Sequence, residues 1–217
     1  MNWFTEHYIE IFGAITGIIY VFLEIKQNIW LWPLGIVTSA VYIYVFYNTG
    51  FYADMGLQWY YLFISIYGWI VWAKGRGHGA GSKECEERGK NGEEANGDRQ
   101  SVEDNKFRII NVRQKQALWL VLITVVLFAG IWFVLASFTD STIPGWDAFT
   151  TALSITATWM LARKIIEHWY LWMIVNVVSI GLYIYKGLYP TVVLFLVYGV
   201  MAIIGYLEWR KEIGWKE

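Results

Sequence analysis

Cysteine and charged residues are scarce in this sequence of 217 residues. The single cysteine, Cys85, excludes an internal disulfide and a cysteine-rich metal site. Charged residues make up 16% of the chain, whereas a typical soluble domain has about 25%. Residues 1–7 contain no basic residue and no small-residue cleavage site, so we expect no removable signal peptide. A soluble or disulfide-stabilised domain is therefore excluded.

Apolar and aromatic residues take the place of the missing charge. Hydrophobic residues make up 57% of the chain, and the mean hydropathy is +0.38. The 14 Trp, 15 Tyr and 12 Phe are typical of a protein whose helix ends are anchored at two membrane interfaces. The composition indicates a polytopic membrane protein.

Seven apolar runs are each long enough to cross a bilayer, which takes about 20 residues of helix. The predicted fold class is therefore an all-α membrane protein with seven transmembrane helices. The predicted spans are residues 9–25, 29–47, 52–73, 117–138, 146–166, 169–185 and 190–209.

A polar stretch, residues 74–116, separates the third and fourth spans. Its centre, about 75–105, is rich in Gly, Glu, Lys and Asn and cannot bury a core, so we predict a disordered insertion. The chain divides into a first three-helix repeat (1–73), a cytoplasmic linker (74–116), a connecting span (117–138) and a second three-helix repeat (139–217).

Basic residues predict the orientation of the chain in the membrane. By the positive-inside rule the side with more Lys and Arg is cytoplasmic, which places the N-terminus outside and the C-terminus inside. On the predicted cytoplasmic side lie Lys26, the basic residues of 74–115, Arg163, Lys164, Arg210, Lys211 and Lys216. On the other side lies Lys186.

The two halves of the sequence resemble each other. The run YGWIVWAK from Tyr67 to Lys74 corresponds to IGYLEWRK at 204–211. Upstream, Leu31-Trp32 corresponds to Leu171-Trp172 after a small shift. Two three-span copies can lie parallel only if an extra span separates them, and the fourth span supplies it. This plan of three plus one plus three spans is a transporter architecture, with the substrate between the halves near the midplane.

One face of the sixth span carries the main candidate binding residues. At 3.6 residues per turn, Trp169, Trp172 and Asn176 share a side of the helix, and Ser179 and Tyr183 continue it. Asn176 falls near the bilayer centre, where an unpaired amide costs on the order of several kcal/mol. A protein partner or a ligand is therefore expected at Asn176.

Differences between the repeats separate candidate site residues from scaffold. Shared pairs such as Gly68/Gly205 and Trp72/Trp209 are expected to serve packing and anchoring. The pairs that differ are Asn176 with Ile36, Trp169 with Ile29, and Gln58 with Phe195. An asymmetric ligand would bind where the symmetric frame has become asymmetric.

Three features of the sequence resemble the PnuC family of vitamin transporters. They are the frame of three plus one plus three spans, the Trp-x-x-Trp-x-x-x-Asn stripe and the run Tyr52-Ala53-Asp54…Leu57-Gln58…Tyr67-Gly68-Trp69. That family is similar in plan to the SWEET sugar transporters, and the resemblance covers all but about residues 75–105. It implies facilitated uptake of nicotinamide riboside, or in relatives thiamine or riboflavin, across the bacterial plasma membrane, with trapping by a cytosolic kinase. Together with the internal repeat and the stripe on the sixth span, this resemblance identifies the candidate substrate-binding residues, which are Trp169, Trp172, Asn176, Gln58, Tyr61, Tyr198, Ser179 and Tyr183.

The chemistry of these vitamins fits such a site. Nicotinamide riboside and thiamine both carry a flat delocalised cation, which a Trp face binds by about 2 kcal/mol when desolvated. Asn176 or Gln58 could pair with a carboxamide or hydroxyl of the substrate. Because the ionisable residues of the spans lie near their ends, we expect a facilitator and not a proton-coupled pump. We expect no cofactor, no metal and no nucleic-acid partner, and the sequence leaves open whether the protein forms a homo-oligomer.

Several polar residues are interpreted as bystanders. Glu24 and Lys26 mark the cytoplasmic end of the first span, and His168 is an interfacial side chain at the start of the sixth. His78 and Cys85 in the linker have no neighbours at metal-ligand spacing.

Other functional classes lack their required residues. A retinal protein needs a lysine in the last span, and residues 190–209 contain none. An intramembrane enzyme needs a nucleophile with a base, or paired carboxylates or histidines, at depth. A purely structural membrane protein would not need Asn176.

Overall fold

The computed structural model describes residues 3–49, 52–89, 109–139, 143–185 and 187–214, and these ranges hold a bundle of helices. No β-strand is formed within them; a single parallel bridge joins Ile110 and Ile165. The helices are α1 (Trp3–Ile25), α2 (Leu31–Thr49), α3 (Tyr52–Gly89), α5 (Gln114–Phe138), α6 (Pro144–Ala162), α7 (His168–Tyr185) and α8 (Tyr189–Gly214). The predicted all-helical fold class is confirmed.

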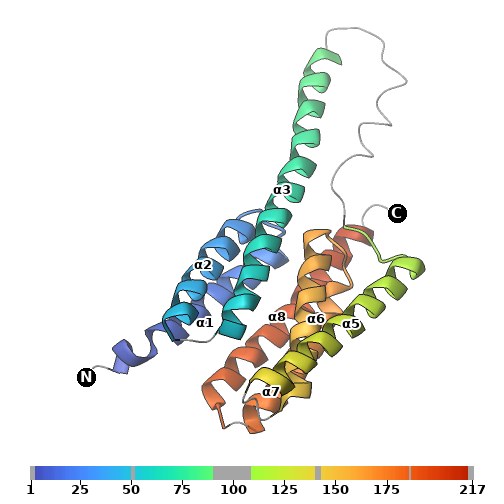
Figure 1. Ribbon diagram of the computed structural model, residues 1–217. Coiled ribbons are helices and arrows are strands. Elements are labelled where there is room, and N and C mark those ends of the chain that lie inside the picture. Colours follow the sequence, from blue (N-terminus) through green and yellow to red (C-terminus); the bar gives the residue numbers. More distant parts are fainter. Residues whose placement is uncertain (1–2, 50–51, 90–108, 140–142, 186, 215–217) are drawn as a thin grey trace.

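The helices alternate in direction through the bundle (Figure 1). Helices α1, α3, α6 and α8 all finish at the end of the bundle where α5 begins, and α2, α5 and α7 run the opposite way. We call this the linker end, because α5, the first helix after the linker in the sequence, begins there.

Long apolar helices are the structure expected of apolar segments in a lipid bilayer. In lipid every backbone N–H and C=O must be satisfied within the segment, which a helix achieves. Three helical segments are long and apolar enough to cross a membrane by length and composition: 114–138 (α5), 168–185 (α7) and 189–213 in α8. Helices α1 and α2 contain shorter apolar stretches, Gly13–Ile25 and Leu31–Tyr47.

All three prolines of the chain stand in the first turn of a helix. Pro33 is in the first turn of α2, Pro144 opens α6 and Pro190 is the second residue of α8. The first-turn N–H has no partner within a helix, so the missing proline N–H costs little there. The prolines therefore mark where helices begin without breaking any of them.

The third helix is longer than the sequence predicts. We expected a span ending at Ala73 and a disordered insertion from about residue 75, but α3 continues to Gly89 and projects beyond the bundle (Figure 1). A helix already formed by a membrane span extends without a new nucleation step. The second half of the added stretch contains Lys, Glu and Arg, which favour helix, whereas its first half is rich in glycine, which does not. The structure describes residues 75–89 as helix, and the division into a linker with a disordered insertion stays a prediction. Residues 90–108, Lys186, Lys216 and the side chains of His78 and Cys85 lie outside the described part of the chain.

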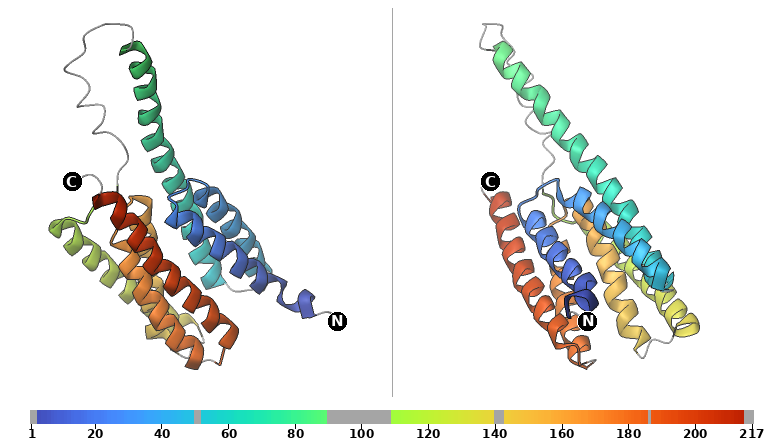
Figure 2. Two further views of the ribbon diagram at one scale, coloured as in Figure 1. Left: turned by 180° about the vertical axis from the view of Figure 1, so that it is seen from behind. Right: turned by 90° about the vertical axis from the view of Figure 1, so that its left-hand side faces the viewer.

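Two groups of three helices face each other in the bundle (Figure 2). In the first half α2 packs along α3, and in the second half α7 packs along α8. The halves meet where α1 contacts α8 and where α3 contacts α6. Helix α5 packs on α6, and its Thr124 hydroxyl lies 2.8 Å from that of Thr156. The central space is thereby enclosed by helices of both halves, with α5 on the outside.

Matching tryptophans pack the linker end of each half. Trp32 of α2 packs on Gly68 of α3, and its ring meets that of Trp72 edge-on with centroids 5.5 Å apart. Trp169 of α7 packs on Gly205 of α8 and meets Trp209 edge-on at 5.8 Å. Only glycine leaves room for an indole this close to a helix backbone.

The same tryptophans tie the two halves together. Trp72 Nε1 of α3 donates to the carbonyl of Ala162 at the end of α6 (3.2 Å). Trp209 Nε1 of α8 donates to the carbonyl of Glu24 near the end of α1 (3.3 Å). Each half therefore caps the other half's first helix with an indole.

The turns that follow α1 and α6 also match. Gln27 and Lys164 both have positive φ, 48° and 54°, a conformation uncommon for residues with a side chain. They lie 137 residues apart, and Lys164 Nζ donates to Gln27 Oε1 at 3.0 Å. Trp32 and Trp169, Gly68 and Gly205, and Trp72 and Trp209 have the same separation in the sequence.

Candidate binding site

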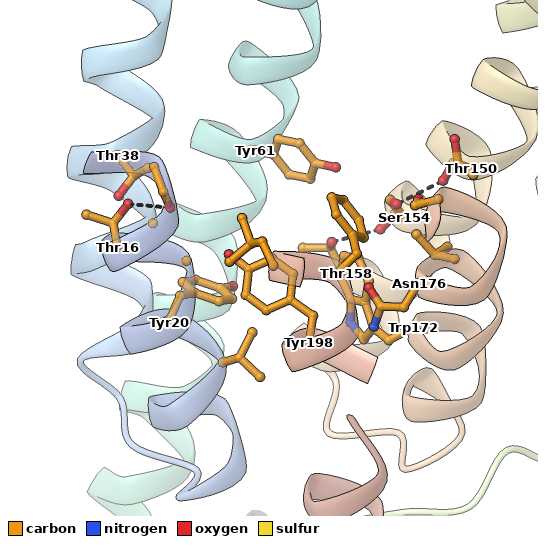
Figure 3. A pocket seen from close by; sticks show the side chains of 18 of the residues that line it. Thr16, Tyr20, Thr38, Tyr61, Thr150, Ser154, Thr158, Trp172, Asn176 and Tyr198 are labelled. Carbon is orange, nitrogen blue, oxygen red and sulfur yellow. Dashed lines mark hydrogen bonds between the residues drawn. The ribbon is translucent and has the colours of Figure 1, made fainter. Parts of the chain in front are cut away.

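A cavity of about 680 Å³ lies between the two halves (Figure 3). Its size suits an organic ligand, because small-molecule sites usually span about 300–1,000 Å³. Residues of α1, α2 and α3 line one side, and residues of α6, α7 and α8 line the other. The centre of the bundle thus offers a binding volume to which both halves contribute.

All eight sequence-predicted site residues line this cavity. Trp169, Trp172, Asn176, Ser179 and Tyr183 come from α7, Gln58 and Tyr61 from α3, and Tyr198 from α8. In Figure 3 Tyr61 faces Asn176 and Trp172 across the cavity. Their common position makes a joint binding role geometrically feasible, and that role stays a prediction.

Asn176 is buried without a protein partner. Its side chain is 4% exposed and lines the cavity. Within the described residues, no hydrogen bond reaches its amide. A carboxamide without water or a protein partner is costly, so a ligand group is the natural complement of Asn176.

Trp169 and Trp172, one helical turn apart, have different surroundings. Trp169 is 1% exposed and packs on Gly205, as Trp32 does on Gly68. The predicted alignment of Trp169 with Ile29 is therefore wrong: Trp169 corresponds to Trp32, with no shift between the sequence blocks.

The constant separation also corrects the other α7 pairs. Asn176 corresponds to Ser39 and not to Ile36, and Trp172 corresponds to Gly35 and not to Trp32. All four residues line the cavity. The two halves therefore differ at these positions. The second half has the amide of Asn176 where the first has the hydroxyl of Ser39, and the indole of Trp172 where the first has Gly35.

The indole N–H groups indicate which tryptophan packs between helices and which is available to a ligand. The Nε1 atoms of Trp32, Trp169 and Trp172 are buried without a hydrogen-bond partner among the described residues. Trp32 does not line the cavity, so an unpaired N–H in its counterpart Trp169 belongs to the packing motif. Trp172 has no tryptophan counterpart, and its unpaired donor next to Asn176 (Figure 3) fits an acceptor on a ligand.

Sequence reasoning missed a set of hydroxyl groups around the cavity. Helix α6 contributes Thr150, Thr151, Ser154 and Thr158. Ser154 donates to Thr150 O and Thr158 to Ser154 O, both at 2.8 Å. The sequence signal was the density of Ser and Thr in an otherwise apolar span. Hydroxyls held in this way can still accept hydrogen bonds from a polar ligand.

The most important omission is a buried pair between the halves. Glu24 and His168 were interpreted as residues at span ends, but their side chains are 3% and 0% exposed. His168 Nε2 lies 3.0 Å from Glu24 Oε1, and Nδ1 is 2.6 Å from the carbonyl of Ile165. The interpretation as bystanders is wrong because the turns after α1 and α6 fold the two residues against each other, 144 positions apart.

Among the described residues, the cavity lining carries one ionisable group other than tyrosine. Glu24 is that group, and no Lys, Arg or His belongs to the described lining. Serine, threonine, tyrosine, amide and indole side chains make up its other polar groups. Such a lining suits a ligand that is neutral or cationic.

The cavity is closed at the linker end. The buried apolar cluster of Trp32, Trp72, Trp169, Trp209 and their aliphatic neighbours lies there. The indole bonds across the halves and the Glu24–His168 pair lie at the same end. A ligand can leave toward the linker end only when these contacts separate.

Comparison with known proteins identifies a family and a solved structure that this chain resembles. The family model described as nicotinamide mononucleotide transporter matches residues 7–211. A solved structure, the crystal structure of the vitamin B3 transporter PnuC, superposes with a TM-score of 0.67 at 22% identity, covering 97% of this chain and 83% of that one. At this identity the superposition establishes the fold.

Curated relatives share most of the length. The nicotinamide riboside transporter PnuC of Escherichia coli is 24% identical over 225 residues, which covers 93% of this chain and 84% of the relative. The riboflavin/roseoflavin transporter RibM of Streptomyces davaonensis is 23% identical, covering 96% of this chain and 92% of the relative. With the family match spanning nearly all of its helices, the chain belongs to the PnuC-type nicotinamide mononucleotide transporter family of multi-pass membrane proteins.

Proposed function

We propose that this protein takes up nicotinamide riboside by facilitated diffusion. The observation that carries the proposal is the cavity between the halves, with Trp172 and Asn176 on one side and Gln58 and Tyr61 on the other. The ring of Trp172 would bind the pyridinium face. Asn176 and Gln58 would pair with the carboxamide or the ribose hydroxyls.

The lining favours the riboside over the phosphorylated mononucleotide. Phosphate is usually held by Arg, Lys or a helix N-terminus, and no basic side chain belongs to the described lining. A dianionic phosphate would also lie close to Glu24. The riboside needs only aromatic and hydrogen-bonding contacts, which the cavity supplies.

Thiamine and riboflavin are the alternatives of the same class. Thiamine presents a flat cation to the same indole, and the relative RibM is named for riboflavin. Trapping by a cytosolic kinase would make uptake by a facilitator effectively one-way. Competition among the vitamins distinguishes the three candidates.

Uptake into liposomes that contain no kinase tests both substrate and mechanism. With the purified protein, labelled nicotinamide riboside should equilibrate across the membrane without accumulating, and a protonophore should leave the initial rate unchanged. Unlabelled riboside should compete at least tenfold more effectively than nicotinamide mononucleotide, thiamine or riboflavin.

Two outcomes would contradict this proposal. Accumulation above the outside concentration that a protonophore abolishes would indicate proton coupling. Stronger competition by thiamine or riboflavin would reassign the substrate. Protein-free liposomes supply the background rate.

A further inference from the structure

The Glu24–His168 pair has a clear direction relative to the cavity. Glu24 belongs to the lining, whereas His168 does not and is 0% exposed. Glu24 is therefore part of the cavity wall, and the imidazole that its carboxyl group contacts lies behind it.

The hydrogen bonds define what the pair can hold. Nδ1 of His168 faces the carbonyl of Ile165 at 2.6 Å and so carries a hydrogen. Nε2 then shares one proton with Glu24 Oε1 across 3.0 Å. With that proton on the imidazole, a carboxylate lies at the cavity wall and its counter-charge lies on the far side.

Nothing else in the described lining offsets this carboxylate. The other lining residues are neutral, and the neighbouring carbonyl of Glu24 is occupied by Trp209 Nε1 at 3.3 Å. In surroundings of low dielectric, a charge acts over several ångströms with little screening. A cation in the cavity lies nearer to Glu24 than to the imidazole behind it.

We propose that Glu24 makes the transporter selective for positively charged ligands, and that His168 is the positioning residue that holds its carboxylate at the cavity wall. This inference rests on the proposed function and deepens it. Trp172 and Asn176 would recognise the flat ring and its amide, and Glu24 would recognise its charge. The ligand class is a flat heteroaromatic cation with polar substituents.

Two ligands that differ in charge test the proposal directly. Nicotinamide riboside and its dihydro form share ring, amide and ribose, but only the first carries a positive charge. Isothermal titration of the full-length protein should give tighter binding of the cation by on the order of tenfold. Glu24→Gln should bring the two affinities within about twofold by weakening the cation alone.

Matched variants separate selectivity from folding. Glu212→Gln makes the same substitution on an exposed carboxylate at the linker end, which accepts a hydrogen bond from Gln27 at 2.6 Å, and it should keep the full preference. His168→Gln should reduce the preference, because the carboxyl group loses the imidazole that holds it in place across 3.0 Å. If Glu24→Gln does not fold, the double variant Glu24→Gln/His168→Gln replaces the pair by two amides that can bond each other.

The outcomes distinguish this inference from the function it rests on. Equal affinities in the wild-type protein, or an undiminished preference in Glu24→Gln or the double variant, would overturn the role of Glu24. An undiminished preference in His168→Gln would overturn the role of His168. Failure of the wild-type protein to bind either form would instead refute the proposed substrate.

Discussion

At the scale of single residues, identical side chains on α7 have different environments. Trp169 fills the space over Gly205, whereas Trp172 faces the cavity with an unpaired N–H. The Trp-x-x-Trp spacing places both on one side of the helix, but the presence of a glycine on α8 decides which indole packs. Asn176, a further turn along, corresponds to a serine in the other half, and its amide has no hydrogen-bond partner within the part of the chain that the structure describes.

Substituting Asn176 tests its role as a ligand contact. Asn176→Leu should lower affinity for nicotinamide riboside at least tenfold, since a buried hydrogen bond to the ligand is lost, and should leave thermal stability unchanged or raised. Thr156→Val is a matched control, because Thr156 is buried on α6 outside the lining and bonds Ala152 O and Thr124. Titration calorimetry together with thermal unfolding in detergent would contradict the assignment if the two variants bound equally well.

At the scale of helices, glycine positions decide how closely the helices of each half approach. A Cβ at Gly68 or Gly205 would collide with the ring of Trp32 or Trp169. Both indoles are at most 1% exposed, so neither can move aside. These contacts hold α2 against α3 and α7 against α8, and so set the walls of the cavity.

Alanine at these glycines should destabilise the bundle. Overpacking typically costs about 1–3 kcal/mol, which exceeds the gain of about 1 kcal/mol that alanine brings to a helix. Gly68→Ala and Gly205→Ala should therefore lower the midpoint of thermal unfolding. Gly181→Ala on α7, where a Cβ meets nothing within 4 Å, should leave it unchanged or raise it; an equal decrease in all three would argue against the packing role.

At the scale of the whole molecule, basic residues are concentrated at the linker end. Lys26, Arg163, Lys164, Arg210 and Lys211 all lie there, on the turns after α1 and α6 and on the end of α8. This arrangement supports the proposal that the linker end is cytoplasmic. The closed end of the cavity would then face the cytoplasm.

Reporter fusions test this orientation. Green fluorescent protein at the C-terminus should fluoresce and alkaline phosphatase there should be inactive, because the first folds in the cytoplasm and the second only outside it. The same reporters fused after Gly187, in the turn between α7 and α8, should give the opposite pattern. Active phosphatase at the C-terminus would invert the proposed topology.

The sequence by itself determined the membrane class, the helical fold and the face of α7 that lines the cavity. These are properties of segments: a run of apolar residues must form a helix in lipid, since its backbone has no other hydrogen-bond partner. The spacing of Trp172 and Asn176 predicts a shared face for the same reason, because it depends on the helix repeat alone.

Only the tertiary structure decided which contacts join segments far apart. The pairing of Glu24 with His168 spans 144 positions, and the correspondence of Trp169 with Trp32 becomes visible through their glycines. No local pattern marks the Glu24–His168 pair, because it depends on how helices pack once they have formed. The separation of Trp169 from Trp32 matches that of Gly205 from Gly68 in the sequence, but their shared packing contact is seen only in the structure. A carboxylate that looked like the end of a span became part of the cavity wall because the two halves close against each other there.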